Sequence, residues 1–387
     1  MNLLNNQVKW WQNPTLYYFQ QLFKNKKIEE KDEKEDILTE EKQAALQKIK
    51  KDLIIWAAIY GACGVVFLYI PFYLFPFLFP FYNMEIIGWV VPFSPIFTIY
   101  GLILAIWEII ALTILNLKMV VNVSKICNFP NYQDKDFDKK IQVLYEVSIE
   151  KQSKELLDFD INPLEGLSKW QITFYTTLNK IKATLGNIII KVILGRIFGR
   201  FLLRYSILKY FIDFVSLPIF AFWDAYTSYK VFRETKVRVL APNVVRHFVL
   251  DFKRNFYNDE AFKAVLLDSL RFIAIAKRSF HHNHYLLAEN IVHHFDLVID
   301  KNRQKLNLEE LLYLIETLNL EQRLALAKLF VLGMLIDGQL SRRDWNVLRI
   351  LDKKDMIINF DYKTLKKWEH NFTQGKGLTE LLQSKLQ

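Results

Sequence analysis

The stretch Leu53–Tyr82 reads LIIWAAIYGACGVVFLYIPFYLFPFLFPFY and contains no charged residue. A helix of about 20 apolar residues is long enough to cross a hydrocarbon core of about 30 Å. Pro71, Pro76 and Pro80 alternate with aromatic residues at the end of the stretch, and proline kinks or ends helices. We therefore expect a membrane span from Leu53 to about Tyr73, followed by an aromatic belt at the far interface.

A second apolar run, Ile96–Leu117, follows after a short connection. Pro95 suits the first turn of this helix, and Lys118 closes it. Between the two runs, residues 83–85 predict a turn, and residues 86–93 predict an interfacial or re-entrant segment. The two runs together predict a transmembrane helical hairpin within residues 53–118.

The charges around the hairpin predict its orientation. Lysines flank both of its ends, whereas the loop between the two spans contains neither Lys nor Arg. The flanking residues are Lys48, Lys50, Lys51, Lys118 and Lys125. Basic residues collect on the cytoplasmic side of membrane spans, so we expect both termini on the cytoplasmic face of the inner membrane.

The overall composition agrees with a membrane location. Hydrophobic residues make up 52% of the chain and aromatic residues 15%, and the formal net charge is +10. A basic chain favours an anionic partner. We expect the lipid bilayer with its anionic phospholipids and no nucleic acid, because no nucleic-acid-reading motif is recognisable. Cys63 and Cys127 are the two cysteines, which excludes a disulfide framework.

Outside the hairpin the sequence divides into four segments. Residues 1–52 are a charged cytoplasmic N-terminal segment, and residues 119–185 are a cytoplasmic helical linker region. Residues 186–230 predict an amphipathic hairpin associated with the membrane or embedded in it. Residues 231–387 repeat apolar residues at helical spacing and predict a cytoplasmic helical bundle. The predicted fold class is therefore all-α.

The segment 186–230 combines apolar runs with a stripe of basic residues. The stripe and its flanks consist of Lys191, Arg196, Arg200, Arg204 and Lys209. Gly195 and Gly199 form a G-x-x-x-G step, which lets another helix approach closely. Because an arginine in the bilayer centre is costly, we favour a position in the cytoplasmic interface, with Pro218 breaking the second stretch, over two further spans. The stripe predicts either contacts with anionic lipid headgroups or ion pairs within the fold.

The C-terminal segment predicts seven helices. They cover residues 243–256, 260–279, 285–298, 308–318, 321–336, 341–352 and 363–372. Each has apolar residues at positions i, i+3, i+4 and i+7, and alternating strand patterns are lacking.

The stretch 327–344, AKLFVLGMLIDGQLSRRD, joins an apolar helix to the next helix. Asp337 and Gly338 are followed by the apolar Leu340, by Ser341 and by the acidic Asp344. This pattern resembles TerB-like domains, which are named for tellurite-resistance proteins and are all-helical with an internal pseudo-repeat. The resemblance implies a helical bundle from about residue 248 to the C-terminus. The whole chain also resembles an uncharacterised bacterial membrane-protein family, which implies no known activity.

The first repeat, residues 272–285, aligns without gaps on the second repeat, residues 332–345, but departs from this pattern. Lys277 stands in the place of the Asp, Arg278 in the place of the Gly, and His284 in the place of the second acid. If TerB-like domains bind a divalent metal through acids of both repeats, the departure puts metal binding in doubt for this chain.

A structural role also explains the second repeat. Gly338 suits a left-handed position after a helix, and Ser341 with Asp344 forms an approximate capping box. Asp337 and Asp344 are therefore either structural, which we favour, or ligands of a divalent metal.

Two further sets of residues have chemical potential. His281, His284 and His294 could bind zinc with one position open, although loop histidines are more commonly solvated. Glu108 lies near the middle of the second span, where a buried acid is a candidate for function. It predicts either an ion pair, with Arg196 or Arg200, or conduction of protons or ions. No catalytic motif is recognisable, and no cofactor is predicted.

These features favour a membrane-anchored, non-enzymatic scaffold or sensor. Its cytoplasmic bundle would bind a protein partner in an envelope-stress or defence system. Two alternatives stay open. One is an oligomeric pore or transporter element that uses Glu108 and the face formed by Gly195 and Gly199. The other is a metal-dependent enzyme that uses the histidines between His281 and His294.

Overall fold

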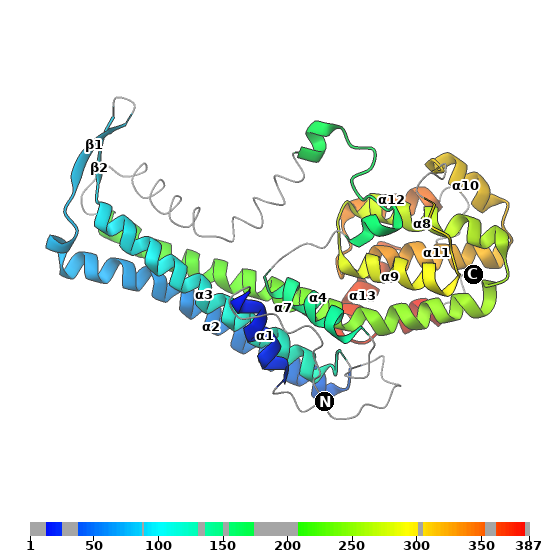
Figure 1. Ribbon diagram of the computed structural model, residues 1–387, viewed down its shortest axis with the longest axis horizontal. Helices are drawn as coiled ribbons and strands as arrows, with labels where there is room; N and C mark the ends of the chain where they lie inside the picture. Colours follow the sequence, from blue (N-terminus) through cyan, green and yellow to red (C-terminus); the bar gives the residue numbers. More distant parts are fainter. Residues whose placement is uncertain are drawn as a thin grey trace.

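The computed structural model describes residues 13–24, 38–86, 89–130, 136–149, 155–173, 208–300, 305–352 and 361–383. Over these ranges the chain is helical apart from one short pair of strands, in agreement with the predicted all-α class. The molecule is elongated: a long helical hairpin extends away from a bundle of shorter helices (Figure 1).

The long hairpin consists of α2 (Glu40–Leu74) and α3 (Pro95–Ile126). The side chains of Thr39 and Ser94 each accept a hydrogen bond from a backbone N–H in the first turn of the helix that follows, which satisfies one of the free donors at each helix start. Both helices are long and apolar enough to cross a membrane. The apolar windows are only 22% and 11% buried within the molecule, unlike the core helix of a soluble protein.

The connection between α2 and α3 differs from our expectation. After the short 3₁₀ turn Pro76–Leu78, the chain forms the antiparallel strands β1 (Tyr82–Ile86) and β2 (Trp89–Phe93). The turn predicted at residues 83–85 is wrong, because these residues lie within β1 and pair with residues 90–92 of β2. Aromatic and β-branched residues such as Trp89, Val90 and Val91 favour an extended pairing. The strands lie at the end of the hairpin farthest from the bundle (Figure 1).

Helix α7 (Leu208–Phe256) is continuous over 49 residues. The prediction that Pro218 breaks this stretch is wrong, since Pro218 and Pro242 both lie inside the helix. A proline removes one helical hydrogen bond. Helix α7 packs along α2 and contacts it at Phe220 and Asp224, close to Pro218. The helix predicted at residues 243–256 is the last part of this longer helix.

Helix α7 runs antiparallel to α2. The Lys50 ammonium lies 5.6 Å from the centre of the Tyr229 ring, and farther along α2, Gly61 lies against Phe220 and Asp224 of α7. As the residue number increases along α2, the number of the contacting residue of α7 decreases, as in an antiparallel pair. In Figure 1 the N-terminal half of α7 follows the hairpin, and its C-terminal half continues along the bundle.

The remaining helices form the bundle and its surroundings. The bundle contains α8 (Glu260–Lys277), α9 (His282–His294), α10 (Leu308–Glu316), α11 (Leu320–Leu335), α12 (Arg342–Asp352), α13 (Tyr362–Gln374) and α14 (Thr379–Gln383). All six helices predicted after residue 260 are confirmed to within a few residues at each end. Helix α11 is at the centre, with nearly every residue from Ala325 to Leu335 buried. Helices α1 (Pro14–Lys24) and α4 (Phe137–Ser148) pack against α3 near the base of the hairpin, and the 3₁₀ turn η2 (Glu155–Phe159) packs against α9.

Candidate functional site

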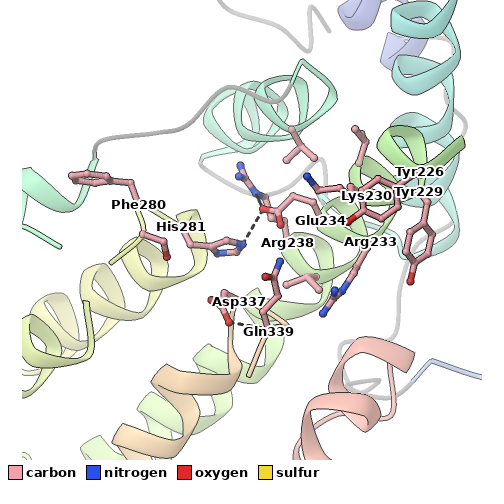
Figure 2. A pocket seen from close by; sticks show the side chains of 14 residues that line it. Tyr226, Tyr229, Lys230, Arg233, Glu234, Arg238, Phe280, His281, Asp337 and Gln339 are labelled. Atoms are coloured by element: carbon pink, nitrogen blue, oxygen red, sulfur yellow. Dashed lines mark hydrogen bonds and ion pairs between the residues drawn. The ribbon is translucent and has the colours of Figure 1, made fainter. Parts of the chain in front are cut away.

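A cavity of about 410 Å³ lies where α7 passes from the hairpin to the bundle. Its walls come from α7, from the turn before α9, from the turn after α11 and from Val147 of α4. The polar and aromatic residues that line it are Tyr226, Tyr229, Lys230, Arg233, Glu234, Arg238, Ser279, Phe280, His281, Asp337 and Gln339 (Figure 2). Most of these residues belong to α7, so the helix that contacts the hairpin also forms the main wall of the cavity.

One wall of the cavity adjoins a buried ion cluster. The Lys277 ammonium at the end of α8 lies 2.7 Å from the Asp337 carboxylate and 3.0 Å from the Asp344 carboxylate. It also donates hydrogen bonds to the carbonyls of Met334 and Gln339. The three charged side chains are at most 9% exposed. Asp337 and Asp344 thus both contact the Lys277 ammonium.

The local geometry of the second repeat confirms the structural prediction. Gly338 has a φ of +69°, the left-handed conformation that favours glycine. The Ser341 side chain accepts a hydrogen bond from the Asp344 backbone N–H, and the Asp344 carboxylate accepts one from the Ser341 N–H. Asp344 therefore both caps α12 and binds Lys277. Both carboxylates contact the Lys277 ammonium, and their alternative role as ligands of a divalent metal stays a prediction.

A second charged group lies deeper in the cavity, around Glu234. Arg238 Nε lies 2.7 Å from the Glu234 carboxylate, and His281 Nε2 lies 2.9 Å from it (Figure 2). Burial alone would raise the pKa of Glu234, but His281 and Arg238 hold it well below its ordinary value. Glu234 is therefore ionised at neutral pH and forms an ion pair with Arg238.

The structure does not bring the three predicted zinc ligands together. His284 and His294 lie ten residues apart on α9, which separates them by about 15 Å along the helix axis. His294 Nδ1 lies 2.9 Å from the carbonyl of Asn290, whereas His284 Nε2 donates to the carbonyl of Gly333 at 2.9 Å. Within the described ranges, no three His, Cys, Asp or Glu side chains are grouped to hold a metal ion.

His284 is a buried, neutral core residue. Burial, with help from His281 and Lys277, lowers the pKa of His284 to about 3. The ring therefore stays uncharged at neutral pH, and its hydrogen bond to Gly333 joins α9 to α11.

Glu108 is buried inside the helical hairpin, as predicted. Its side chain is 8% exposed, and it lies so close to α2 that a Cβ on Gly64 would come within 2.7 Å of the Glu108 carboxylate. One turn earlier on α2, a Cβ on Gly61 would meet Asp224 and the Phe220 carbonyl of α7. Two acidic residues therefore pack against glycines that are one helical turn apart.

The basic stripe cannot be placed in the same way. Lys191, Arg196, Arg200 and Arg204, with Gly195 and Gly199, lie outside the described residues, and so does the proposed pairing of Glu108 with Arg196 or Arg200. Lys209 belongs to the first turn of α7.

Of the residues that line the cavity, the sequence singled out only His281 and Asp337, and not those on α7. Lys230, Glu234 and Arg238 fall in a helical stretch without a motif, and only the i, i+4 spacing of Glu234 and Arg238 indicates an ion pair.

Comparisons with protein-family models, with curated proteins and with solved structures found no match to this chain. The resemblance to TerB-like domains therefore rests on the residues around Asp337 alone.

Proposed function

We propose that this protein is a membrane-anchored, non-enzymatic scaffold or sensor whose bundle binds a protein partner. The observation that supports this best is the continuity of α7 from the hairpin into the bundle. At a rise of about 1.5 Å per residue, a helix of 49 residues extends over about 74 Å. Such a helix transmits a displacement at the membrane end directly to the bundle.

The anchor in this proposal is the hairpin of α2 and α3 in a bacterial inner membrane. Large apolar side chains on its outer surface support this placement, for example Trp56, Ile103 and Trp107, which are 51%, 58% and 46% exposed. An exposed apolar surface of this extent is unfavourable in water and favourable in lipid. The charge pattern supports an orientation with both termini in the cytoplasm. Carbonate extraction of native membranes tests the anchor, and release of the protein would contradict it.

The bundle offers an apolar surface for a partner. A groove of about 200 Å³ is lined by apolar residues of α8, α11 and α12 with little polar surface. At its edges Leu308 and Ile350 are 39% and 51% exposed. Exposed apolar patches of this kind often mark protein–protein interfaces.

Photo-crosslinking in cells tests the partner hypothesis. We would place a photoreactive phenylalanine analogue at Ile350, with Lys363 on α13 as an exposed control position. The hypothesis predicts one specific protein adduct at Ile350 that is weakened by the neighbouring substitution Val347→Glu and is absent at Lys363. Adducts that are equal at both positions would contradict it.

A pore or transporter element remains a second candidate because of Glu108. Buried acids in membrane helices are often part of ion or proton paths, and Glu108 is buried between apolar helices. The measurement is the conductance of the reconstituted full-length protein. This candidate predicts an oligomeric channel whose conductance is lost in Glu108→Gln, and a monomer or dimer without conductance would remove it.

A further inference from the structure

The cavity beside α7 lies at the level of the membrane surface when the hairpin spans the bilayer. The charged part of α2 ends at Asp52, where the uncharged stretch begins. Lys50, just before this point, lies over the ring of Tyr229. About two turns from Tyr229 on α7, the apolar side chains of Phe222 and Trp223 are 68% and 39% exposed. Tyr226 and Tyr229 thus mark the boundary between the apolar and the charged parts of α7, and both line the cavity.

The cavity has more basic than acidic groups available to a ligand. Of its two acids, Asp337 is bound to Lys277 and Glu234 is bound to Arg238 and His281. Arg233 donates to the carbonyl of Gly338 and contacts Glu369 outside the cavity. The two cations that keep donors for a ligand are Lys230 and Arg238.

The guanidinium of Arg238 is the group in the cavity that is best suited to bind an anion. Its side chain is 7% exposed, and its Nε is engaged by Glu234. Its Nη1 is buried and has no hydrogen-bond partner. A buried charged donor without a partner is costly, and a guanidinium is suited to bind a phosphate through two parallel hydrogen bonds.

Lys230 is placed to contact the same ligand from the solvent side. It precedes Arg238 by two turns on α7, is exposed, and lies over the ring of Tyr226. In Figure 2, Lys230, Glu234 and Arg238 project from one side of α7, while Arg233 points the other way, toward the turn of Asp337 and Gln339. The volume of about 410 Å³ falls within the range of small-ligand pockets, about 300–1,000 Å³.

We propose that this cavity binds the phosphate of an anionic phospholipid headgroup, with Arg238 and Lys230 as donors and Tyr226 and Tyr229 at the membrane-facing rim. A lipid is favoured over a soluble phosphate because the rim is continuous with the outward-facing apolar residues of α7. The residues of this site are not those of the basic stripe predicted between Lys191 and Lys209. The proposal rests on the membrane anchor of the proposed function and adds a ligand through which the lipid composition of the membrane can act on α7.

Native mass spectrometry of the full-length protein in detergent tests the site. The probes are phosphatidylglycerol, phosphatidylcholine and inorganic phosphate. We expect phosphatidylglycerol to bind at least tenfold more tightly than phosphatidylcholine. Lys230→Gln should weaken phosphatidylglycerol binding by about fivefold, and Arg238→Gln should weaken it further. The matched control is Lys253→Gln, because Lys253 lies on the same helix, over the ring of Tyr257 and away from the cavity, and it should leave binding unchanged.

Three results would overturn the proposal. The first is equal binding of the two lipids. The second is an equal effect of Lys230→Gln and Lys253→Gln. The third is displacement of phosphatidylglycerol by inorganic phosphate that binds alone with the same dependence on Arg238, which would assign the site to a soluble ligand. If Arg238→Gln lowers the unfolding temperature, Lys230→Gln decides, because its side chain is exposed. Failure of the anchor itself is separate, since it shows as release of the protein by carbonate.

Discussion

The two halves of α7 lie in regions with opposite arrangements of apolar side chains. Along the hairpin, large residues such as Ile219 and Phe222 point outward and are 60% and 68% exposed. Along the bundle, residues of the same helix such as Val245 and Phe248 are fully buried. Along one continuous helix, the large apolar side chains are therefore exposed in the first half and buried in the core of the bundle in the second half.

The contacts that hold the helices together also differ between the two regions. In the hairpin, helices come close where α2 has Gly61 and Gly64. In the bundle, buried charges are arranged in pairs, such as Lys277 with Asp337 and Arg271 with Asp268. In the proposed membrane anchor, lipid does not drive helices together as water does, so close backbone packing would matter more in the hairpin. In the bundle, burial of apolar residues dominates and each buried charge requires a partner.

The largest effect is expected from Lys277→Met. The substitution leaves the Asp337 and Asp344 carboxylates buried without their cation, which should cost about 3–5 kcal/mol of unfolding free energy. Thermal unfolding of the full chain in detergent, followed by tryptophan fluorescence, measures the loss. The control is Lys367→Met, because Lys367 pairs with Glu380 at the surface and should change little. Adding Asp344→Asn to Lys277→Met should recover part of the loss; equal losses in the two lysine variants would contradict the buried cluster.

Gly61→Ala tests the packing of α7 on the hairpin. Its Cβ would come within 2.7 Å of the Phe220 carbonyl oxygen, a backbone atom of α7, so the helices must separate. Overpacking of this kind costs about 1–3 kcal/mol. Gly64→Ala is the matched control, because its Cβ meets only the end of the Glu108 side chain, which can rotate away. A smaller loss of thermal stability in Gly61→Ala than in Gly64→Ala would contradict the close contact with α7.

The sequence predicted elements whose signals are local. The two spans, the bundle helices and the capping box of Ser341 with Asp344 follow from apolar periodicity, charge and capping residues. The strands β1 and β2 were missed because each has only five residues, which is too short for a clear strand pattern. In addition, β2 contains Pro92. The continuity of α7 was missed because Pro218 is a strong local signal for a break, and packing on α2 overrides that signal.

The candidate site could be predicted only in part. The sequence showed that Lys277 replaces an acid of the pattern. It did not show that the Lys277 ammonium reaches Asp337 and Asp344, since this contact depends on how α8 packs against α11 and α12. Likewise, no local feature marks Arg238 as buried, because the cavity forms only when α7 lies against α9 and the turn after α11.

Acid pH should weaken the bundle through His284. Its pKa is about 3 in the folded protein and about 6.5 in an unfolded chain. Below about pH 6.5 the unfolded state therefore binds the extra proton, and stability falls as pH decreases toward 3. Between pH 7 and pH 5 the loss from this group is about 2 kcal/mol. The pKa of His282 is also lowered by burial, so it adds to the loss in the same direction.

The measurement is the unfolding temperature as a function of pH for the full chain and for His284→Gln. Glutamine can still donate to the Gly333 carbonyl and does not titrate, so the variant should have a flatter profile between pH 7 and pH 5. His293→Gln is the control, because His293 is exposed on the same helix. A profile in His284→Gln as steep as that of the parent would show that His284 is not the group responsible.

The smallest effect is expected from Leu102→Ala, and it tests the comparison most directly. Leu102 on α3 is 49% exposed, whereas Leu326 on α11 is fully buried. Leu326→Ala should cost about 2–5 kcal/mol because it leaves a cavity. If the hairpin is the proposed membrane anchor, Leu102→Ala removes atoms that face detergent or lipid, and it should change the unfolding free energy by less than about 0.5 kcal/mol. Both variants are measured by thermal unfolding of the full chain in detergent. If Leu102→Ala were as destabilising as Leu326→Ala, the outer face of α3 would be a protein contact, as an oligomeric pore requires, and not a lipid-facing surface.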